Sequence, residues 1–168
     1  LFRERVNRLL EGSLEHRLTL MVAETGFGKT TSLLAFLERA EVPQVFWFSV
    51  RGAERDPRLF LSYLFSAFSQ RGLNLGQEAL RLLANTETDE TDALVALVNT
   101  LSQHLPGPSL LVLDDFQSVR ESRSVVALVD WFVDHLPREL HLIISSRVAL
   151  SFSSLNRWRL KGEVLELG

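Results

Sequence analysis

The first residues with chemical potential form a glycine-rich loop, AETGFGKTT, at positions 23–31. The loop follows the apolar run 18–22 and precedes an apolar stretch with helical spacing, so it is predicted to join a strand to a helix. Its glycines permit backbone conformations in which successive N–H groups point at a polyphosphate, and the helix start adds unpaired amides and the positive end of its dipole. The residues predicted to bind the phosphates are Thr25, Gly26, Phe27, Gly28, Lys29, Thr30 and Thr31.

Two side chains of this loop have separate expected roles. Lys29 would reach the β- and γ-phosphates as a point charge, and the Thr30 hydroxyl would complete the coordination of a Mg²⁺ ion between them. The strict pattern G-x-x-x-x-G-K-S/T begins with glycine, whereas this chain has Ala23. The alternative is a glycine-rich turn that binds nothing. The strand before the loop and the helix after it favour the phosphate-binding interpretation.

A pair of carboxylates follows a second apolar run. The segment LLVLDD, 110–115, comes after the turn-forming PGPS and is typical of a buried parallel strand. Carboxylates at the C-terminal end of such a strand emerge where ligands bind in open α/β sheets. As in a Walker B strand, Asp114 is expected to hold Mg²⁺ through water and Asp115 to orient the attacking water. The alternative is a strand that ends in a solvated Asp-Asp turn, and the phosphate loop favours the metal site.

A third apolar run, LHLIISSR at 140–147, ends in two hydroxyls and a guanidinium. If this strand lies between the other two, Arg147 would detect or stabilise the charge of the terminal phosphate. The alternative is a solvated arginine just past a strand end. The two motifs described above favour the functional interpretation.

These groups require elements that bring them together. Apolar runs that alternate with helical stretches predict an α/β fold with a doubly wound parallel sheet. The expected strands are 18–22, 45–50, 110–113, 140–145 and 164–167. The expected helices are 29–40, 57–70, two between 73 and 103 on either side of a polar loop at 85–92, and 125–136. The helix at 57–70 is apolar on more than one face, so it is either buried on two sides or meets a partner.

Composition excludes several classes of function. The 168 residues, 46% of them hydrophobic, suffice for one domain with a sizeable core. The net charge of −3 offers no basic footprint for DNA or RNA. The apolar runs are too short to span a bilayer and no signal peptide opens the chain, so no membrane partner and a cytoplasmic location are expected. The chain has no cysteine and its histidines lack metal-ligand spacing, so zinc is not expected.

In order, the chain contains GFGKTT, DPRLF, LVLDDF, SSR and RWRLKGEVLELG. Over nearly its whole length this series resembles the nucleotide-binding domain of STAND-class P-loop ATPases (NACHT/NB-ARC-like), especially the maltose-regulator-like branch of large LuxR-type transcription activators. The resemblance implies a three-layer P-loop NTPase fold whose five-stranded parallel sheet has the order 5-1-4-3-2 and helices on both faces. That order would place the strand of Arg147 between the other two motif strands.

The resemblance also implies roles for particular residues. It assigns Lys29 and Thr30 to Walker A, Asp114 and Asp115 to Walker B, and the sensor position to Arg147. Near the start of the chain, Arg3 and Arg5 would help to enclose the adenine. Members of this family resemble switches that are ADP-bound at rest and self-associate when ATP-bound, with slow hydrolysis as the reset.

Residues 1–168 are therefore expected to form a single nucleotide-binding domain cut from a longer regulator, in which DNA binding belongs to domains outside this chain. The leading prediction is an ATP/ADP-dependent switch with slow, Mg²⁺-dependent hydrolysis. One alternative is a P-loop kinase that transfers the γ-phosphoryl group of ATP to a small acceptor, although only Arg157 and Arg159 follow the fourth strand as lid arginines. Another is a binding module without turnover, against which Asp115 argues.

Overall fold

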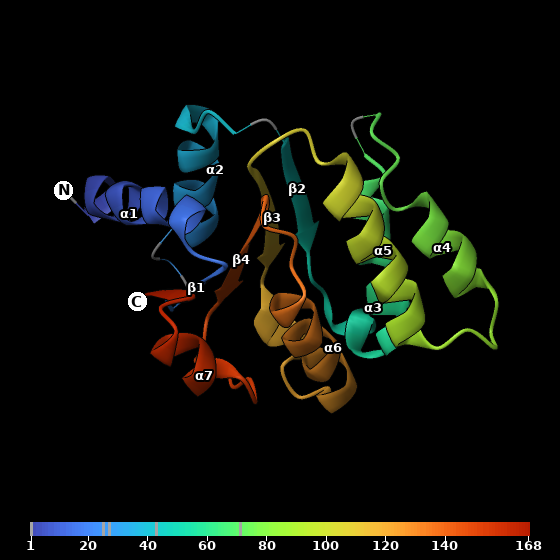
Figure 1. The fold of residues 1–168 in the computed structure, drawn as a ribbon. Helices are drawn as coiled ribbons and strands as arrows, with labels where there is room; N and C mark the ends of the chain where they lie inside the picture. The colour runs from blue at the N-terminus through green and yellow to red at the C-terminus, as the bar shows by residue number, and fades with distance from the viewer. Residues whose placement is uncertain (1, 25, 27, 43, 71) are drawn as a thin grey trace.

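The structure, a computed structural model, describes residues 2–24, 26, 28–42, 44–70 and 72–168, apart from the side chains at 2, 3, 5, 6 and 9. Its helices are α1 (Phe2–Glu11), α2 (Lys29–Arg39), α3 (Pro57–Phe68), α4 (Gln77–Ala84), α5 (Glu90–His104), α6 (Arg123–Asp134) and α7 (Leu155–Leu160). Its strands are β1 (Leu18–Val22), β2 (Gln44–Ser49), β3 (Ser109–Asp114), β4 (Leu140–Ser146) and β5 (Val164–Leu167). The short 3-10 turns η1 (Gly12–Glu15), η2 (Gly52–Arg55) and η3 (Phe116–Val119) complete the described elements (Figure 1).

The strands form one parallel sheet in the order β2-β3-β4-β1-β5. Read from the other edge, this is the predicted order 5-1-4-3-2, so the α/β P-loop fold class is confirmed. Every strand lies within one residue of its predicted bounds at each end. Because β4 pairs with both β1 and β3, the carboxyl ends of the three strands that carry the chemical motifs are neighbours at one edge of the sheet.

Helices cover both faces of the sheet and give the three layers that the resemblance implied. Figure 1 shows α1 and α2 on one side and α3, α5 and α6 on the other, with α4 further out. Side chains of β3 alternate between these faces: Leu110 and Val112 belong to the cluster that includes Leu33 of α2, whereas Leu111 and Leu113 belong to the larger cluster. Both faces of β3 are therefore dry, which explains its unbroken apolar run.

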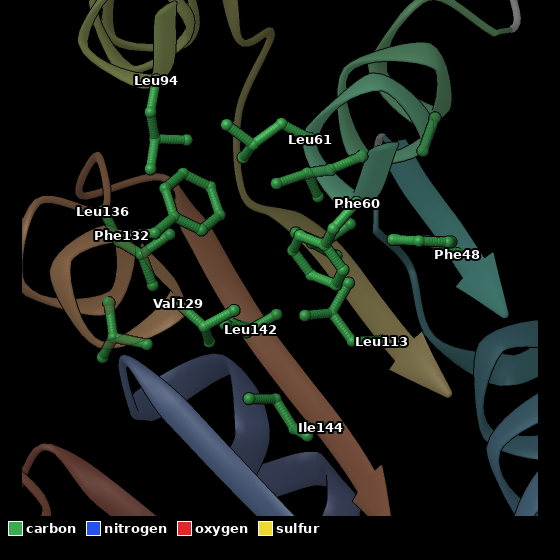
Figure 2. Packing of buried hydrophobic residues seen from close by; sticks show 14 of the residues in the cluster. Phe48, Phe60, Leu61, Leu94, Leu113, Val129, Phe132, Leu136, Leu142 and Ile144 are labelled. Carbon is green, nitrogen blue, oxygen red and sulfur yellow. The ribbon is translucent and has the colours of Figure 1, made fainter. Parts of the chain in front are cut away.

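The larger cluster fills the space between the sheet and helices α3, α5 and α6. In Figure 2, Phe60 of α3 lies near Leu113 of β3, and its ring centroid is 5.3 Å from that of Phe48 in β2. In the same view the ring of Phe132 of α6 points toward Leu94 of α5, and Val129 of α6 lies beside Leu142 of β4. Burial of each such side chain contributes about 1.5–3 kcal/mol, so this core fixes the strands whose ends form the site.

Helix α3 is apolar on two sides because it is buried on two sides. Phe60, Leu64 and Phe68 are among its buried residues, and the helix packs against β2 as well as against α4 and α5. Its start follows the predicted signal: the carboxylate of Asp56 accepts a hydrogen bond from the N–H of Leu59 at 2.9 Å, and Pro57 occupies the first turn. A missing partner is not needed to explain its composition.

Helix α7 has no counterpart among the predicted elements because its six residues are too few for a periodic pattern. Tertiary contacts hold it instead. Asp134, at the end of α6, accepts hydrogen bonds from Trp158 Nε1 at 2.7 Å and from Arg157 Nη2 at 2.6 Å. Burial raises the pKa of the Asp134 carboxyl, but these two hydrogen bonds outweigh burial and hold that pKa below its usual value.

The longest described helix, α5, has 15 residues, and no helix in the described part of the chain is long and apolar enough to cross a bilayer.

Candidate functional site

The glycines of the loop between β1 and α2 adopt left-handed backbone conformations. Gly26 has φ of 94° and Gly28 has φ of 69°. A Cβ at either position would meet no atom within 4 Å, so glycine is required by the backbone conformation and not by lack of space. The carbonyl of Gly28 accepts the first bond of α2, from the N–H of Ser32 at 2.8 Å. The described part of the loop therefore has the strand-to-helix geometry that the sequence predicted.

Lys29 opens α2 with a buried ammonium group. The residue is 8% exposed, and its Nζ donates to the carbonyl of Ala23 and, at 3.4 Å, to that of Glu24. These partners are neutral, and no ion pair of Lys29 with a carboxylate occurs in the described part of the chain. A buried cation without a counter-ion is costly unless an anion joins it. The group therefore fits a phosphate.

Thr30 and Asp114 lie together although 84 residues separate them in the chain. The Thr30 hydroxyl donates to Oδ2 of Asp114 at 3.0 Å. Asp114 ends β3 and is 4% exposed, so its carboxylate is held in place rather than solvated. A hydroxyl and a carboxylate are the oxygen donors that Mg²⁺ takes alongside water and phosphate. The pair fits the predicted metal ligands.

Ser145, on the neighbouring strand β4, contacts both aspartates. The sequence alone did not identify it as a site residue. Its Oγ donates to Oδ1 of Asp114 and accepts the N–H of Asp115 at 3.1 Å. That N–H is also within 3.1 Å of Oδ1 of Asp114. The backbone of Asp115 is in the left-handed region, with φ of 58° and ψ of 40°. This conformation is unfavourable for a residue other than glycine, and the hydrogen bonds to its N–H help to stabilise it. The only sequence signal was a buried hydroxyl at the end of an apolar strand.

Asp115 and Arg147 form the outer part of the site. Nε of Arg147 lies 3.7 Å from Oδ1 of Asp115, and the side chains are 50% and 38% exposed. An ion pair this exposed is worth at most about 1 kcal/mol, so the arginine can leave it at low cost. The predicted sensor and the predicted water-orienting residue are thus in contact without being locked together.

Gln117 connects these two residues and is the second functional candidate that sequence reasoning missed. Its Nε2 donates to Oδ1 of Asp115 at 3.1 Å, and its Oε1 accepts the backbone N–H of Arg147 at 3.0 Å. A glutamine two residues after a carboxylate pair has no recognisable pattern, so only the fold reveals it.

For some of the predicted site residues, the structure describes no contact with the rest of the site. Thr25 and Phe27 lie outside the described residues, as do the side chains of Arg3 and Arg5, whose backbone belongs to α1. Thr31 is exposed in the first turn of α2. Contacts of these five residues with a nucleotide therefore remain predictions.

A hollow of about 570 Å³ lies at the other end of the sheet, where β1 and β4 begin. Its polar lining includes His16, Arg17, Arg138 and His141. Ligands of open α/β sheets bind at the carboxyl ends of the strands, and this hollow is at the amino ends. None of the predicted site residues lines it.

Comparison with known proteins gives a match for most of the chain. A family model described as "AAA domain" matches residues 13–146. Curated relatives include the HTH-type transcriptional regulator MalT of Vibrio cholerae, 26% identical over 166 residues, and that of Yersinia enterocolitica, 29% identical over 169 residues. Each alignment covers 99% of this chain but only 18% of the relative, so the chain spans less than a fifth of the length of these regulators.

Two solved structures share the fold. The ORC1 protein of Aeropyrum pernix, solved in complex with DNA, aligns with a TM-score of 0.58 at 18% identity over 99% of this chain and 44% of its own. The Drosophila ORC bound to DNA aligns with a TM-score of 0.56 at 18% identity over 98% of this chain and 40% of its own. At this identity the likeness concerns the fold alone.

Proposed function

This chain belongs to the AAA domain family, and from that premise we propose that it is an ATP/ADP-binding regulatory switch domain with slow, Mg²⁺-dependent ATP hydrolysis. The regulator relatives confirm the predicted resemblance to the maltose-regulator-like branch. In this proposal residues 1–168 act as one nucleotide-binding domain of a longer transcription regulator.

One observation carries the proposal. Three neighbouring strand ends bring together a buried lysine without a counter-ion, a hydroxyl–carboxylate pair, and a second carboxylate in contact with an arginine. The cation suits a polyphosphate, the pair suits Mg²⁺, and the outer groups suit water and a terminal phosphate. Position at the carboxyl edge of a parallel sheet supports the same assignment.

Each residue has a proposed task in hydrolysis. Lys29 binds the β- and γ-phosphates, the backbone at Gly26 and Gly28 shapes the cradle, and Thr30 and Asp114 hold the metal ion. Bound Mg²⁺ supplies charge neutralisation at the phosphates. Asp115 orients the attacking water.

Arg147 distinguishes ATP from ADP in this proposal. It rests on Asp115 through a weak ion pair and is free to turn toward added negative charge. Only ATP carries the terminal phosphate that would draw it away. The switch therefore needs no large motion within the sheet.

Slow turnover follows from two features of Asp115. Its side chain is shorter than the glutamate of many fast ATPases, and at rest its carboxylate is paired with Arg147. Slow hydrolysis would let the ATP state persist long enough to signal. Self-association in that state and DNA binding are proposed for the full-length regulator, through segments outside this chain.

The kinase alternative gains no support from the arginines that follow β4. Arg157 is paired with Asp134 at 2.6 Å, and Arg159 is paired with Glu166 at 2.6 Å. Both guanidinium groups are thus paired with carboxylates of neighbouring elements. No second function is proposed.

Phosphate release from ATP tests the proposal. We expect Mg²⁺-dependent release at least tenfold slower than the roughly 10 s⁻¹ of a median enzyme, and loss of release when EDTA removes the metal. Radiolabelled ATP shows where the phosphoryl group goes. Label that appears in an added small acceptor and not in free phosphate would favour the kinase; release that persists in EDTA would contradict the metal assignment.

A further inference from the structure

We propose that Gln117 is a positioning residue that holds the Asp115 carboxylate and the Arg147 backbone in one fixed relation, so that hydrolysis depends on it while nucleotide binding does not. The inference rests on the proposed function, because it assigns a further residue to the same edge of the sheet.

The Gln117 side chain uses both ends of its amide. Nε2 donates to the carboxylate of Asp115 and Oε1 accepts from the N–H of Arg147. A carboxylate can only accept and a backbone N–H can only donate, so the orientation of the amide is determined by its partners. Glutamate in its ionised form would supply the acceptor but not the donor, and methionine would supply neither.

The backbone of Asp115 is fixed independently of Gln117. Its N–H is held by Asp114 and Ser145, which anchors the turn between β3 and η3 to β4. The side-chain carboxylate of Asp115 is held by other contacts. Within the described part of the chain, it is contacted only by Nε2 of Gln117 and by Nε of Arg147.

These two contacts differ in strength. The Arg147 pair is long and half-exposed and is worth less than about 1 kcal/mol, whereas a hydrogen bond to a charged group contributes about 1.5–3 kcal/mol. When Arg147 turns toward a terminal phosphate, Gln117 is therefore the contact that keeps the carboxylate in place. Gln117 also accepts a hydrogen bond from the backbone N–H of Arg147. This bond fixes the backbone at the end of β4, from which the Arg147 side chain extends.

The contacts also leave one oxygen of the carboxylate for water. Both Gln117 and Arg147 engage Oδ1 of Asp115. Oδ2 has no hydrogen-bond partner within the part of the chain that the structure describes, so it is the oxygen that would orient water. Loss of Gln117 lets the carboxylate rotate, and water is then held in the wrong place.

Two variants separate the two hydrogen bonds, and a third serves as control. Gln117→Met removes both with little change in size, Gln117→Glu retains only the acceptor, and Gln103→Met makes the same exchange at an exposed site on α5. For each protein we would measure amide hydrogen exchange at Arg147 without nucleotide, affinity for ATP and ADP, and single-turnover ATP hydrolysis.

For Gln117→Met we expect exchange of the Arg147 amide to quicken roughly fivefold, the loss of one hydrogen bond of about 1 kcal/mol. Hydrolysis is expected to slow about tenfold, as positioning defects do, while nucleotide affinity stays within about twofold. Gln103→Met should match the parent chain in all three measurements.

For Gln117→Glu the exchange of the Arg147 amide should stay protected, because the acceptor is retained. Hydrolysis relative to the parent chain should rise as pH falls from about 7 toward about 5, because the neighbouring Asp115 carboxylate favours protonation of the introduced carboxyl and the protonated form regains a donor for Asp115. Gln117→Met should show no such trend, since it has no titratable group.

Parent-like hydrolysis in both Gln117 variants would overturn the inference and leave the proposed function intact. A fall in affinity that parallels the fall in rate would also overturn it, since Gln117 would then be structural. If the parent chain binds neither ATP nor ADP, the proposed function fails and the inference fails with it.

Discussion

Replacing Lys29 with alanine is expected to lower the affinity of the chain for ATP and for ADP by roughly 100-fold, because a hydrogen bond to a charged group contributes about 1.5–3 kcal/mol. The Lys29 ammonium is buried against two backbone carbonyls and has no carboxylate partner in the described part of the chain. A bound phosphate would supply the negative charge that the Lys29 ammonium lacks. Titration of a fluorescent ADP or ATP analogue measures the loss.

The chain offers a matched control for this experiment. Its only other lysine, Lys161, is exposed and lies just after α7, so Lys161→Ala makes the same change of charge away from the loop. We expect Lys161→Ala to bind nucleotide as the parent chain does. Unchanged affinity in Lys29→Ala, with the fold intact by circular dichroism, would contradict the assignment of the phosphate site.

The second large effect is expected from Asp115→Asn, which should reduce hydrolysis by about 100-fold or more, the usual contribution of a group that handles the proton of the attacking water. Nucleotide affinity should stay within about threefold, because Asp115 holds neither the phosphates nor the metal in the proposed site. Asparagine is chosen because it tolerates the left-handed backbone at this position and retains an oxygen for Gln117.

Single-turnover hydrolysis and equilibrium binding, measured on the same preparation, separate the two effects. Asp92→Asn is the control: it removes one carboxylate from an exposed position in the first turn of α5. A variant at position 115 that hydrolyses ATP at the parent rate would show that another group orients the water. Equal losses of rate and affinity would instead make Asp115 a binding residue.

The sheet was predictable because its strands are buried on both faces and are therefore continuous apolar runs. β3 is the clearest case: all six of its residues are buried, and its predicted range differs by one residue at each end. Periodicity predicted helices α2, α3 and α6 in the same way. Strand order came from the resemblance and not from periodicity, since no local pattern encodes which strands pair.

Elements whose positions depend on single tertiary contacts were not predicted. Helix α7 exists because Trp158 is buried and its indole donates to Asp134 on α6. Helix α1 packs against α2 through Leu10, which is fully buried. In both cases the stabilising partner lies in a distant part of the chain.

The same distinction applies to the site. Lys29, Thr30, Asp114, Asp115 and Arg147 could be predicted as candidates because their spacing and their position next to apolar runs are motifs. Ser145 and Gln117 were missed because their roles exist only once β3 and β4 are adjacent. Residues that position other side chains are therefore recognised only in the folded structure, whereas phosphate-binding residues can often be predicted from a sequence motif.

Nucleotide binding at the carboxyl edge of the sheet can be mapped by the changes in backbone amide NMR shifts on addition of Mg²⁺-ADP. We expect the largest shifts at Gly28, Lys29 and Thr30, smaller ones at Asp114 and Ser145, and none around the hollow where β1 and β4 begin. Shifts confined to that hollow, or no shifts at any nucleotide concentration, would contradict nucleotide binding at the carboxyl edge.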